Sequence, residues 1–232
     1  MHIFAVVGGG GAGRPIAGRR TPAVVESHYP RRMLRARPSS SRDLALIASF
    51  AALVAVLGLP GSLSLFGNAV PITLQTLGVM LAGSVLGWRR GGAALLVFLV
   101  LVAAGLPLLG GGRGGLGVFA GPSAGFLLAW PLGAAVTGWL TERTLPAYPV
   151  WWGLTANLLG AVAVVYAIGI PVQAAVLGTS SLLSTAVAAT VFLPGDVVKA
   201  IVATVVAAGV HRAYPVAPAA RRQRERAAST AR

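Results

Sequence analysis

The chain of 232 residues is 56% hydrophobic and only 10% charged, with a mean hydropathy of +0.78. This composition is typical of a protein that crosses a membrane several times, and it excludes an ordinary soluble domain. The net charge of +14 would also suit a nucleic-acid-binding protein. However, the arginines cluster in the two tails and in short turns between apolar segments, as the positive-inside rule predicts. We therefore expect a lipid bilayer around the chain and no nucleic-acid partner.

Residue types needed for several kinds of chemistry are missing or unsuitably placed. The sequence contains no cysteine, which excludes disulfides, thiolate nucleophiles and cysteine-based metal sites. Its three histidines, His2, His28 and His211, lie in or beside the tails, so none is available to a metal site or a catalytic base within the membrane. The sequence therefore predicts no metal and no catalytic residue.

Both ends of the chain differ in composition from the part between them. Residues 1–41 contain a glycine run, scattered prolines and several arginines, and they offer nothing that can bury a core. We interpret them as a disordered basic leader, with Met33 as an alternative start. Residues 213–232 are a second basic segment, interpreted as a cytoplasmic tail.

Six apolar segments between the tails are predicted to be membrane helices. They cover about residues 43–59, 72–86, 92–109, 126–140, 153–170 and 194–210, within a membrane domain at 42–212. Most arginines fall on alternate connections: the leader, the Arg89–Arg90 turn, the turn at Arg143 and the tail. The other three connections contain only Arg113. The sequence thus predicts an all-α polytopic membrane protein with six transmembrane helices and both termini in the cytoplasm.

The first predicted helix carries small residues at a spacing of four, among them Ala48 and Ala52. Such a face lets another helix approach closely. From spacing alone, contact with a partner helix and ordinary internal packing are equally good interpretations.

Polar residues enter the second and fifth predicted helices. In the stretch Val70-Pro71-Ile72-Thr73-Leu74-Gln75-Thr76-Leu77, the threonines can hydrogen-bond to their own helix, so Gln75 is the one side chain that demands a distant partner. Asn157 and Tyr166 are the polar members of the fifth helix. Each of these residues is a pocket candidate, and each could instead satisfy a neighbouring helix.

Glycine makes up half of residues 110–125, between the third and fourth predicted helices. So many glycines predict neither a stable helix nor a strand. Irregular backbone at membrane depth is tolerated only where protein or a cavity surrounds it. We interpret the stretch as a flexible lid, with a plain surface loop as the alternative. A phosphate-binding loop is excluded because no Gly-Lys-Ser/Thr follows.

The stretch Leu193-Pro194-Gly195-Asp196-Val197-Val198-Lys199 opens the last predicted helix. Lys199 is the chain's only lysine, and Asp196 is one of five acids. Three residues apart, they project from one helix face, and each costs about 2.5–3.5 kcal/mol at the centre of a membrane helix. The pair either neutralises itself to hold the helix or forms a polar site for a ligand. We favour the ligand site, because charges within the membrane are functional by default.

Four stretches of the sequence, which follow one another along the chain in the family's order, resemble the BioY family. Its members are the biotin-binding S components of energy-coupling factor (ECF) vitamin transporters. The resemblance covers about residues 44–210, and one departure is Phe126, where similar members often have tyrosine. It implies the ECF S-component fold, a high-affinity biotin site near the outer face, a gating loop between helices three and four, and contact between the first helix and a coupling subunit. The four stretches are Val70–Leu77 and Leu193–Lys199, quoted above, Gly111-Gly112-Arg113-Gly114-Gly115-Leu116-Gly117, and Gly121-Pro122-Ser123-Ala124-Gly125-Phe126.

Biotin offers two ureido N–H donors, a ureido carbonyl, an apolar bicycle and a carboxylate. Asp196 can accept from the ureido N–H groups, whereas Lys199 could bind either the carboxylate or the ureido carbonyl. The candidate biotin-binding residues are Asp196, Lys199, Gln75, Thr73, Arg113, Gly114, Gly115, Phe126, Tyr166 and Asn157, and the candidate partner-helix contacts are Ala48 and Ala52.

The sequence has no ATP-binding Gly-Lys-Ser/Thr loop and predicts no cofactor of its own. The resemblance therefore implies separate partners, an ECF transmembrane coupling subunit and two ABC-type ATPases that use ATP, in a bacterial cytoplasmic membrane. One alternative is an S component or small secondary transporter for another vitamin or organic anion. Others are an intramembrane enzyme using Asp196 and Lys199 as acid and base, which lacks an evident nucleophile, and a purely structural membrane partner.

Overall fold

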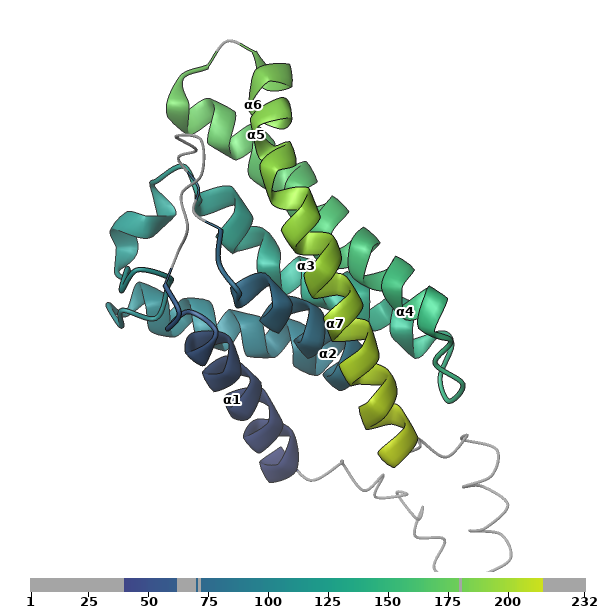
Figure 1. Ribbon diagram of the computed structural model, residues 1–232. Coiled ribbons are helices and arrows are strands. Elements are labelled where there is room, and N and C mark those ends of the chain that lie inside the picture. The colour runs from purple at the N-terminus through teal and green to yellow at the C-terminus, as the bar shows by residue number, and fades with distance from the viewer. Residues whose placement is uncertain (1–39, 62–69, 71, 180, 215–232) are drawn as a thin grey trace, which may run out of the picture. The chain divides into compact units, whose positions relative to one another are not determined.

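The computed structural model describes residues 40–61, 70, 72–179 and 181–214 (Figure 1). The predicted leader at 1–41, including Met33, and the tail at 213–232 lie almost entirely outside the described residues. Within the described part, every named element is a helix, and the bridge between Leu109 and Arg113 is isolated.

The helical segments of the described chain include two groups that run on without a break, as the helices Val150–Leu177 and Leu182–Ala213. In chain order they are α1 (Ser40–Val56), α2 (Gln75–Ala103), the 3-10 turn η1 (Leu116–Phe119), α3 (Ala124–Glu142), α4 (Val150–Asn157), the π-helical stretch η2 (Leu158–Val164), α5 (Val165–Leu177), α6 (Leu182–Ala189), the 3-10 turn η3 (Thr190–Phe192) and α7 (Leu193–Ala213).

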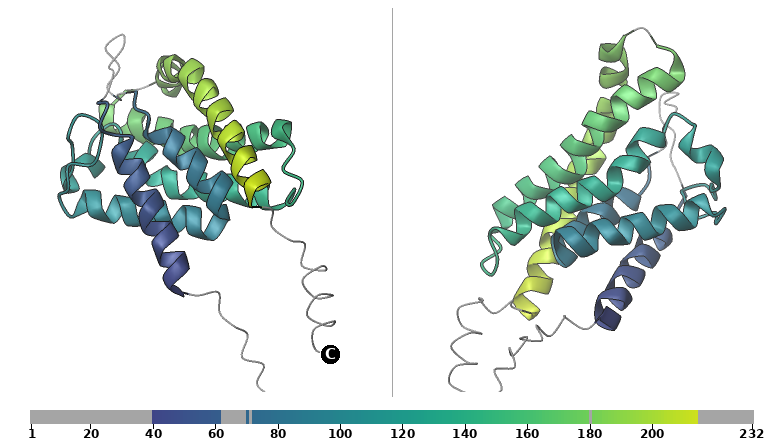
Figure 2. Two further views of the ribbon diagram at one scale, coloured as in Figure 1. Left: turned by 60° about the horizontal axis from the view of Figure 1, so that its bottom comes forward. Right: turned by 180° about the vertical axis from the view of Figure 1, so that it is seen from behind.

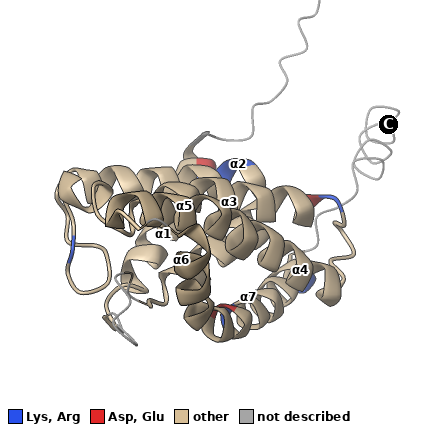
Figure 3. Cartoon of the chain, turned by 90° about the horizontal axis from the view of Figure 1, so that it is seen from above, with Lys and Arg blue, Asp and Glu red and all other residues tan. Residues whose placement is uncertain are grey.

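Four of the described helices are long and apolar enough to cross a membrane. They are Gln75–Ala103, Ala124–Glu142, the α4–α5 helix Val150–Leu177 and the α6–α7 helix Leu182–Ala213. Figure 3 shows how few charged residues these helices carry, and both signs meet on α7. The prediction of an all-α membrane protein is confirmed in this coarser form.

The predicted turn between the second and third helices lies inside α2, at Gly87. This residue has φ 81° and ψ 179°, a conformation that essentially only glycine adopts, and it divides α2 into two arms. The arms fold back on each other, since a Cβ atom on Gly91 would lie 2.7 Å from the Ala82 carbonyl oxygen. The first amide after the turn, Trp88 N–H, donates to Glu142 Oε1 of α3 at 3.0 Å.

Several predicted helix ends differ from the observed ones. The third predicted helix, 92–109, ends at Ala103, because Gly105 at φ 103° and Pro107 cannot continue it. The first predicted helix ends at Val56 rather than at residue 59, and the second begins at Gln75 rather than at residue 72. The fifth is longer, Val150–Leu177, and the sixth follows α6 without a break.

Helix α2 lies at the centre of the packing. It contacts α1, α3 and α7, and α3 in turn packs against α5 and η2. Val79, Met80, Leu95 and Phe98 of α2 are fully buried. In Figures 1 and 2 the start of α1 and the end of α7 lie on the same side of the helices. Two contacts near the Gly87 turn hold these ends.

The first of these contacts is an ion pair of 2.9 Å between Arg90 of α2 and Asp43 of α1. The second is a hydrogen bond of 2.9 Å between His211 Nε2 of α7 and the Ser84 carbonyl oxygen of α2. The start of α1 and the end of α7 are thus both anchored to α2 close to its Gly87 turn.

Replacing Gly87 with alanine should lower the melting temperature of the detergent-solubilised protein. Alanine would have to adopt a backbone conformation that essentially only glycine adopts, and its Cβ would meet the Glu142 carboxylate. We therefore expect a loss of about 1–3 kcal/mol in unfolding free energy. Gly209→Ala is the matched control, because Gly209 lies in α7 with no atom near its Cβ position. Equal melting temperatures of the two variants would contradict the proposed turn.

Candidate functional site

A cavity lies where the first arm of α2, α3, α5, α7 and the glycine-rich loop meet. Its polar lining comes from four places: Thr73, Gln75 and Thr76 at the start of α2, Tyr166 in α5, Asp196 and Lys199 in α7, and Arg113 and Ser123 in the loop. The apolar lining is Val70, Ile72, Leu109, Phe126, Leu127, Trp130, Ala161, Val165 and Phe192. A polar wall and an apolar wall therefore face the same space.

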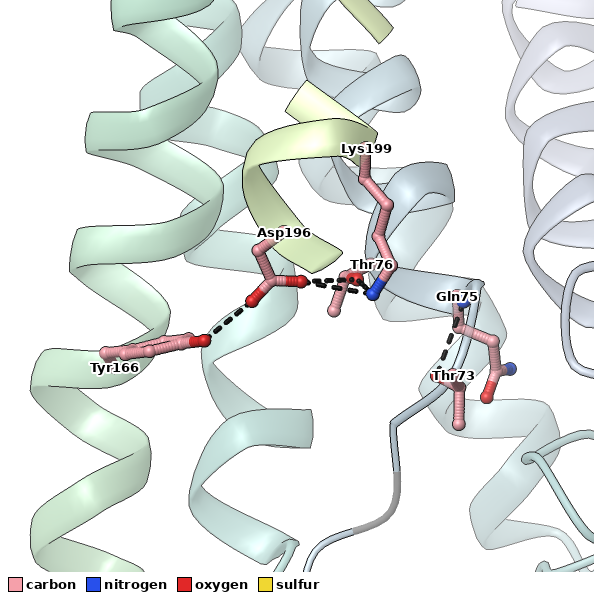
Figure 4. A network of polar contacts seen from close by, with 6 residues as sticks. All are labelled: Thr73, Gln75, Thr76, Tyr166, Asp196 and Lys199. Carbon is pink, nitrogen blue, oxygen red and sulfur yellow. Dashed lines mark hydrogen bonds and ion pairs between the residues drawn. The ribbon is translucent and has the colours of Figure 1, made fainter. Parts of the chain in front are cut away.

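The polar wall is a connected network around one ion pair (Figure 4). Lys199 Nζ lies 3.1 Å from Asp196 Oδ1, which confirms that the two residues share a helix face. Lys199 also donates to Thr76 Oγ1 at 2.9 Å, and Thr76 donates to Asp196 Oδ1 at 3.3 Å. On the far side, Tyr166 O–H donates to Asp196 Oδ2 at 2.6 Å. The pair is therefore shared by three helices.

Both charged residues are buried, Asp196 to 5% and Lys199 to 8% exposure. An ammonium group has three N–H donors and a carboxylate has about four acceptor positions. The contacts above use two of those donors and three of those acceptor positions. Each charged group therefore keeps capacity for one further hydrogen bond, in a wall that already faces the cavity.

Aromatic rings form much of the apolar wall. Phe126 packs edge-on against Tyr166 and Phe192, with ring centroids 6.1 and 6.5 Å apart. Deeper in α3, Trp130 packs against Phe98 of α2 at 6.0 Å. Such a wall suits the flat, apolar part of a small ligand.

Arg113 brings a second positive charge to the cavity. A short turn fixes its position, since its backbone pairs with Leu109 in both directions and its Nε donates to the Gly110 carbonyl oxygen at 3.3 Å. The ion pairs of the described chain involve other residues. With Asp196 and Lys199 cancelling, the described lining of the cavity has a net charge of +1.

Gln75 lines the cavity, but its amide is already used. Its Nε2 donates to the carbonyl oxygens of Val54 and Leu108, and its Oε1 accepts from Gly110 N–H. Thr73 Oγ1 accepts from the Gln75 backbone N–H at 3.3 Å. The structure thus places both residues at the cavity but gives the Gln75 side chain a scaffold role.

Asn157 lies away from the cavity, in contrast to its predicted role as a pocket residue. It is fully buried, and it donates to the Gly153 carbonyl oxygen and to Thr204 Oγ1 while accepting from Ser84 O–H. These bonds join α4 to α2 and α7. Its amide therefore satisfies neighbouring helices, which is the alternative that the sequence left open.

The loop glycines among the predicted site residues also lie outside the cavity lining. The backbone N–H of Gly115 donates to the Val102 carbonyl oxygen at 2.7 Å, and Gly114 packs against the backbone of Leu106. They hold the loop against the end of α2. The loop includes the 3-10 turn η1, which the glycine content did not predict, while its interpretation as a flexible lid stays a prediction.

Ten residues of the lining were not among the site residues predicted from the sequence, and they include Thr76, Ser123, Trp130 and Phe192. Trp130 follows Phe126 by four residues, so a helical pattern starting from Phe126 contained a signal for it. Nothing comparable in the sequence singled out Phe192, whose position depends on the turn at η3.

Comparison with known proteins yields consistent matches. The model of the BioY family matches residues 31–216. A biotin transporter BioY from Rhizobium etli is 48% identical over 186 residues, covering 78% of this chain and 98% of the relative. A biotin transporter BioY from Rhodobacter capsulatus is 46% identical over 195 residues, with the same coverage of each chain.

The fold is also similar to that of a solved protein. The crystal structure of the S-component for biotin from an ECF-type ABC transporter superimposes with a TM-score of 0.68 and 33% sequence identity. The match covers 74% of this chain and 90% of that one.

Proposed function

The chain belongs to the BioY family, and we propose that it is the biotin-binding subunit of an ECF vitamin uptake system. The single observation that carries this beyond family membership is the cavity around the Asp196–Lys199 pair. Its polar wall, apolar wall and separate positive charge match the ureido group, bicycle and carboxylate of biotin.

The ureido group fits the ion-pair network. Asp196 keeps an acceptor position for a ureido N–H, and Lys199 keeps a donor for the ureido carbonyl. Because Lys199 is already held by Asp196 and Thr76, we assign it to the carbonyl rather than to the ligand carboxylate. Charge-assisted hydrogen bonds of this kind are about twice as strong as neutral ones.

The carboxylate is assigned to Arg113. In the described lining, Arg113 is the positive group without an acid beside it, so a monoanion brings the net charge of the cavity from +1 to zero. A guanidinium also matches the planar geometry of a carboxylate. The bicycle then lies against Phe126 and Trp130.

The membrane arrangement follows from the helix ends. Six spans result when α1, the two arms of α2, α3, the α4–α5 helix and the α6–α7 helix each cross once. The start of α1 and the end of α7 lie on one side (Figures 1 and 2), and their contacts with Arg90 and Ser84 put the Arg89–Arg90 turn there too, so the positive-inside rule puts this side in the bacterial cytoplasm. The cavity, at the opposite end of the first arm of α2, then faces outward.

Ala48 and Ala52 are proposed to contact the transmembrane coupling subunit, which two ABC-type ATPases would drive with ATP. Both residues are exposed on α1, whereas Ala51 and Val54 on its other face are buried against α2. Internal packing therefore leaves the Ala48–Ala52 face free for a close-packed partner helix.

Purified protein should bind biotin, and Asp196→Asn should lose tight binding while remaining folded. The asparagine keeps one acceptor for Tyr166 but brings its own N–H groups to the ureido N–H groups, so we expect affinity to fall at least a hundredfold, about 2.7 kcal/mol. Calorimetric titration with biotin, checked by thermal melting of both proteins, measures this.

Competition separates biotin from other ligands. Desthiobiotin should displace labelled biotin, whereas thiamine and riboflavin should not. Unchanged biotin affinity in folded Asp196→Asn would refute the site, and tighter binding of another vitamin would favour the alternative S component.

Replacing Arg113 with glutamine should weaken biotin binding but barely change binding of biotin methyl ester. The variant loses the charge that pairs with the carboxylate, and the ester has no such charge to lose. We expect the wild-type preference for acid over ester, about tenfold or more for one charged hydrogen bond, to disappear. An equal loss of affinity for both compounds would instead assign Arg113 to the loop structure.

Replacing both Ala48 and Ala52 with tryptophan should abolish energised uptake of labelled biotin without changing the affinity of the purified subunit. The bulky side chains prevent close helix approach, and α1 contributes no described residue to the cavity lining. Val205→Trp is the control, because Val205 is 61% exposed on α7. Parental uptake in the double variant would contradict the proposed contact.

A further inference from the structure

The side chain of Gln75 joins three backbone groups from two different segments. Nε2 donates to the carbonyl oxygen of Val54 in α1 at 3.2 Å and to that of Leu108 at 3.0 Å, and Oε1 accepts from Gly110 N–H at 3.1 Å. The residue is 1% exposed. Figure 4 shows its amide directed away from the Asp196–Lys199 pair.

These bonds supply partners that the local backbone does not provide. In a regular helix the Val54 carbonyl would accept from Gly58 N–H, but Gly58 N–H donates to the Ala55 carbonyl oxygen instead. Gly58 in turn touches the loop, because a Cβ atom there would lie 2.7 Å from the Leu108 carbonyl oxygen. Gln75 therefore caps the end of α1 and fixes the loop to it.

The segment that Gln75 holds is the one that positions Arg113. The guanidinium donates to the Gly110 carbonyl, and the backbone of Arg113 pairs with Leu109, so moving Arg113 away from the cavity requires moving Leu109 and Gly110 with it or breaking these bonds. A second, half-open cavity of about 390 Å³ adjoins this turn and is lined by Gly58, Leu108 and Leu109 among others. The turn thus has space to move once its bonds are broken.

We infer that Gln75 is a positioning residue: it latches the Leu108–Arg113 turn to the end of α1 and so holds Arg113 at the cavity. Opening the cavity at this side requires breaking the two hydrogen bonds from Gln75 to the loop. The hydrogen bond to the Val54 carbonyl oxygen fixes the Gln75 amide to α1. The latch slows both entry and exit of the ligand. The inference rests on the proposed function only in taking biotin as that ligand.

A cysteine probe tests the latch directly. The chain contains no cysteine, so Leu109→Cys supplies a single thiol at a position that is 2% exposed. Adding Gln75→Met should raise its rate of labelling by a thiol reagent, in the absence of biotin, by about tenfold or more, because the two hydrogen bonds that hold the loop are lost. Without the probe, Gln75→Met should raise the association rate of biotin and raise its dissociation rate more, because the turn opens more readily and Arg113 is no longer held at the cavity.

Asn157→Leu is the matched control, since it removes an equally buried amide with three hydrogen bonds away from the cavity. It should lower the melting temperature and leave labelling unchanged. If Gln75→Met does not fold, Gln75→Glu keeps the acceptor for Gly110 and should give a smaller increase. Unchanged labelling, or an equal increase in Asn157→Leu, overturns the latch. Faster labelling in a protein that does not bind biotin would support the latch and refute the function.

Discussion

The ion pair between Asp196 and Lys199 is the interaction on which the site depends. A charge within a membrane helix is tolerated when it is paired and hydrogen-bonded, and here the partners come from α2 and α5 as well as α7. Meeting that requirement brings three helices together around one point. The cavity is therefore a consequence of how the charges are satisfied, and its polar wall is ordered before any ligand arrives.

Two buried amides show how scaffold and site divide the polar residues. Gln75 and Asn157 each make three hydrogen bonds with their side chains, and both looked like pocket residues in the sequence. Asn157 joins α4 to α2 and α7 near the Gly87 turn, whereas Gln75 joins α1 to the loop beside the cavity. A buried amide with three hydrogen bonds thus fixes the packing of helices at one end of the protein. At the other end, the same kind of amide holds the loop beside the cavity.

The sequence predicted the features that stand out chemically from an apolar background. Asp196 and Lys199 were identifiable because charges are rare there, and their spacing fixed their common face. Asn157 could not be assigned, since periodicity gives the face of a helix but not the helix that the face will meet. The end of α2 at Ala103 was also missed, because the apolar pattern continues to Leu109 while Gly105 and Pro107 end the helix.

The π-helical stretch between α4 and α5 gives this helix a change of phase. A π-helical hydrogen bond joins residues five apart instead of four. The two halves of the helix are therefore rotated relative to each other about the helix axis. Asn157 precedes the stretch and Tyr166 follows it. The orientation of Tyr166 toward Asp196 is therefore set independently of the face that Asn157 presents to α2 and α7. Loss of one residue from Leu158–Val164 would turn Tyr166 by about 100° and detach the phenol from the carboxylate.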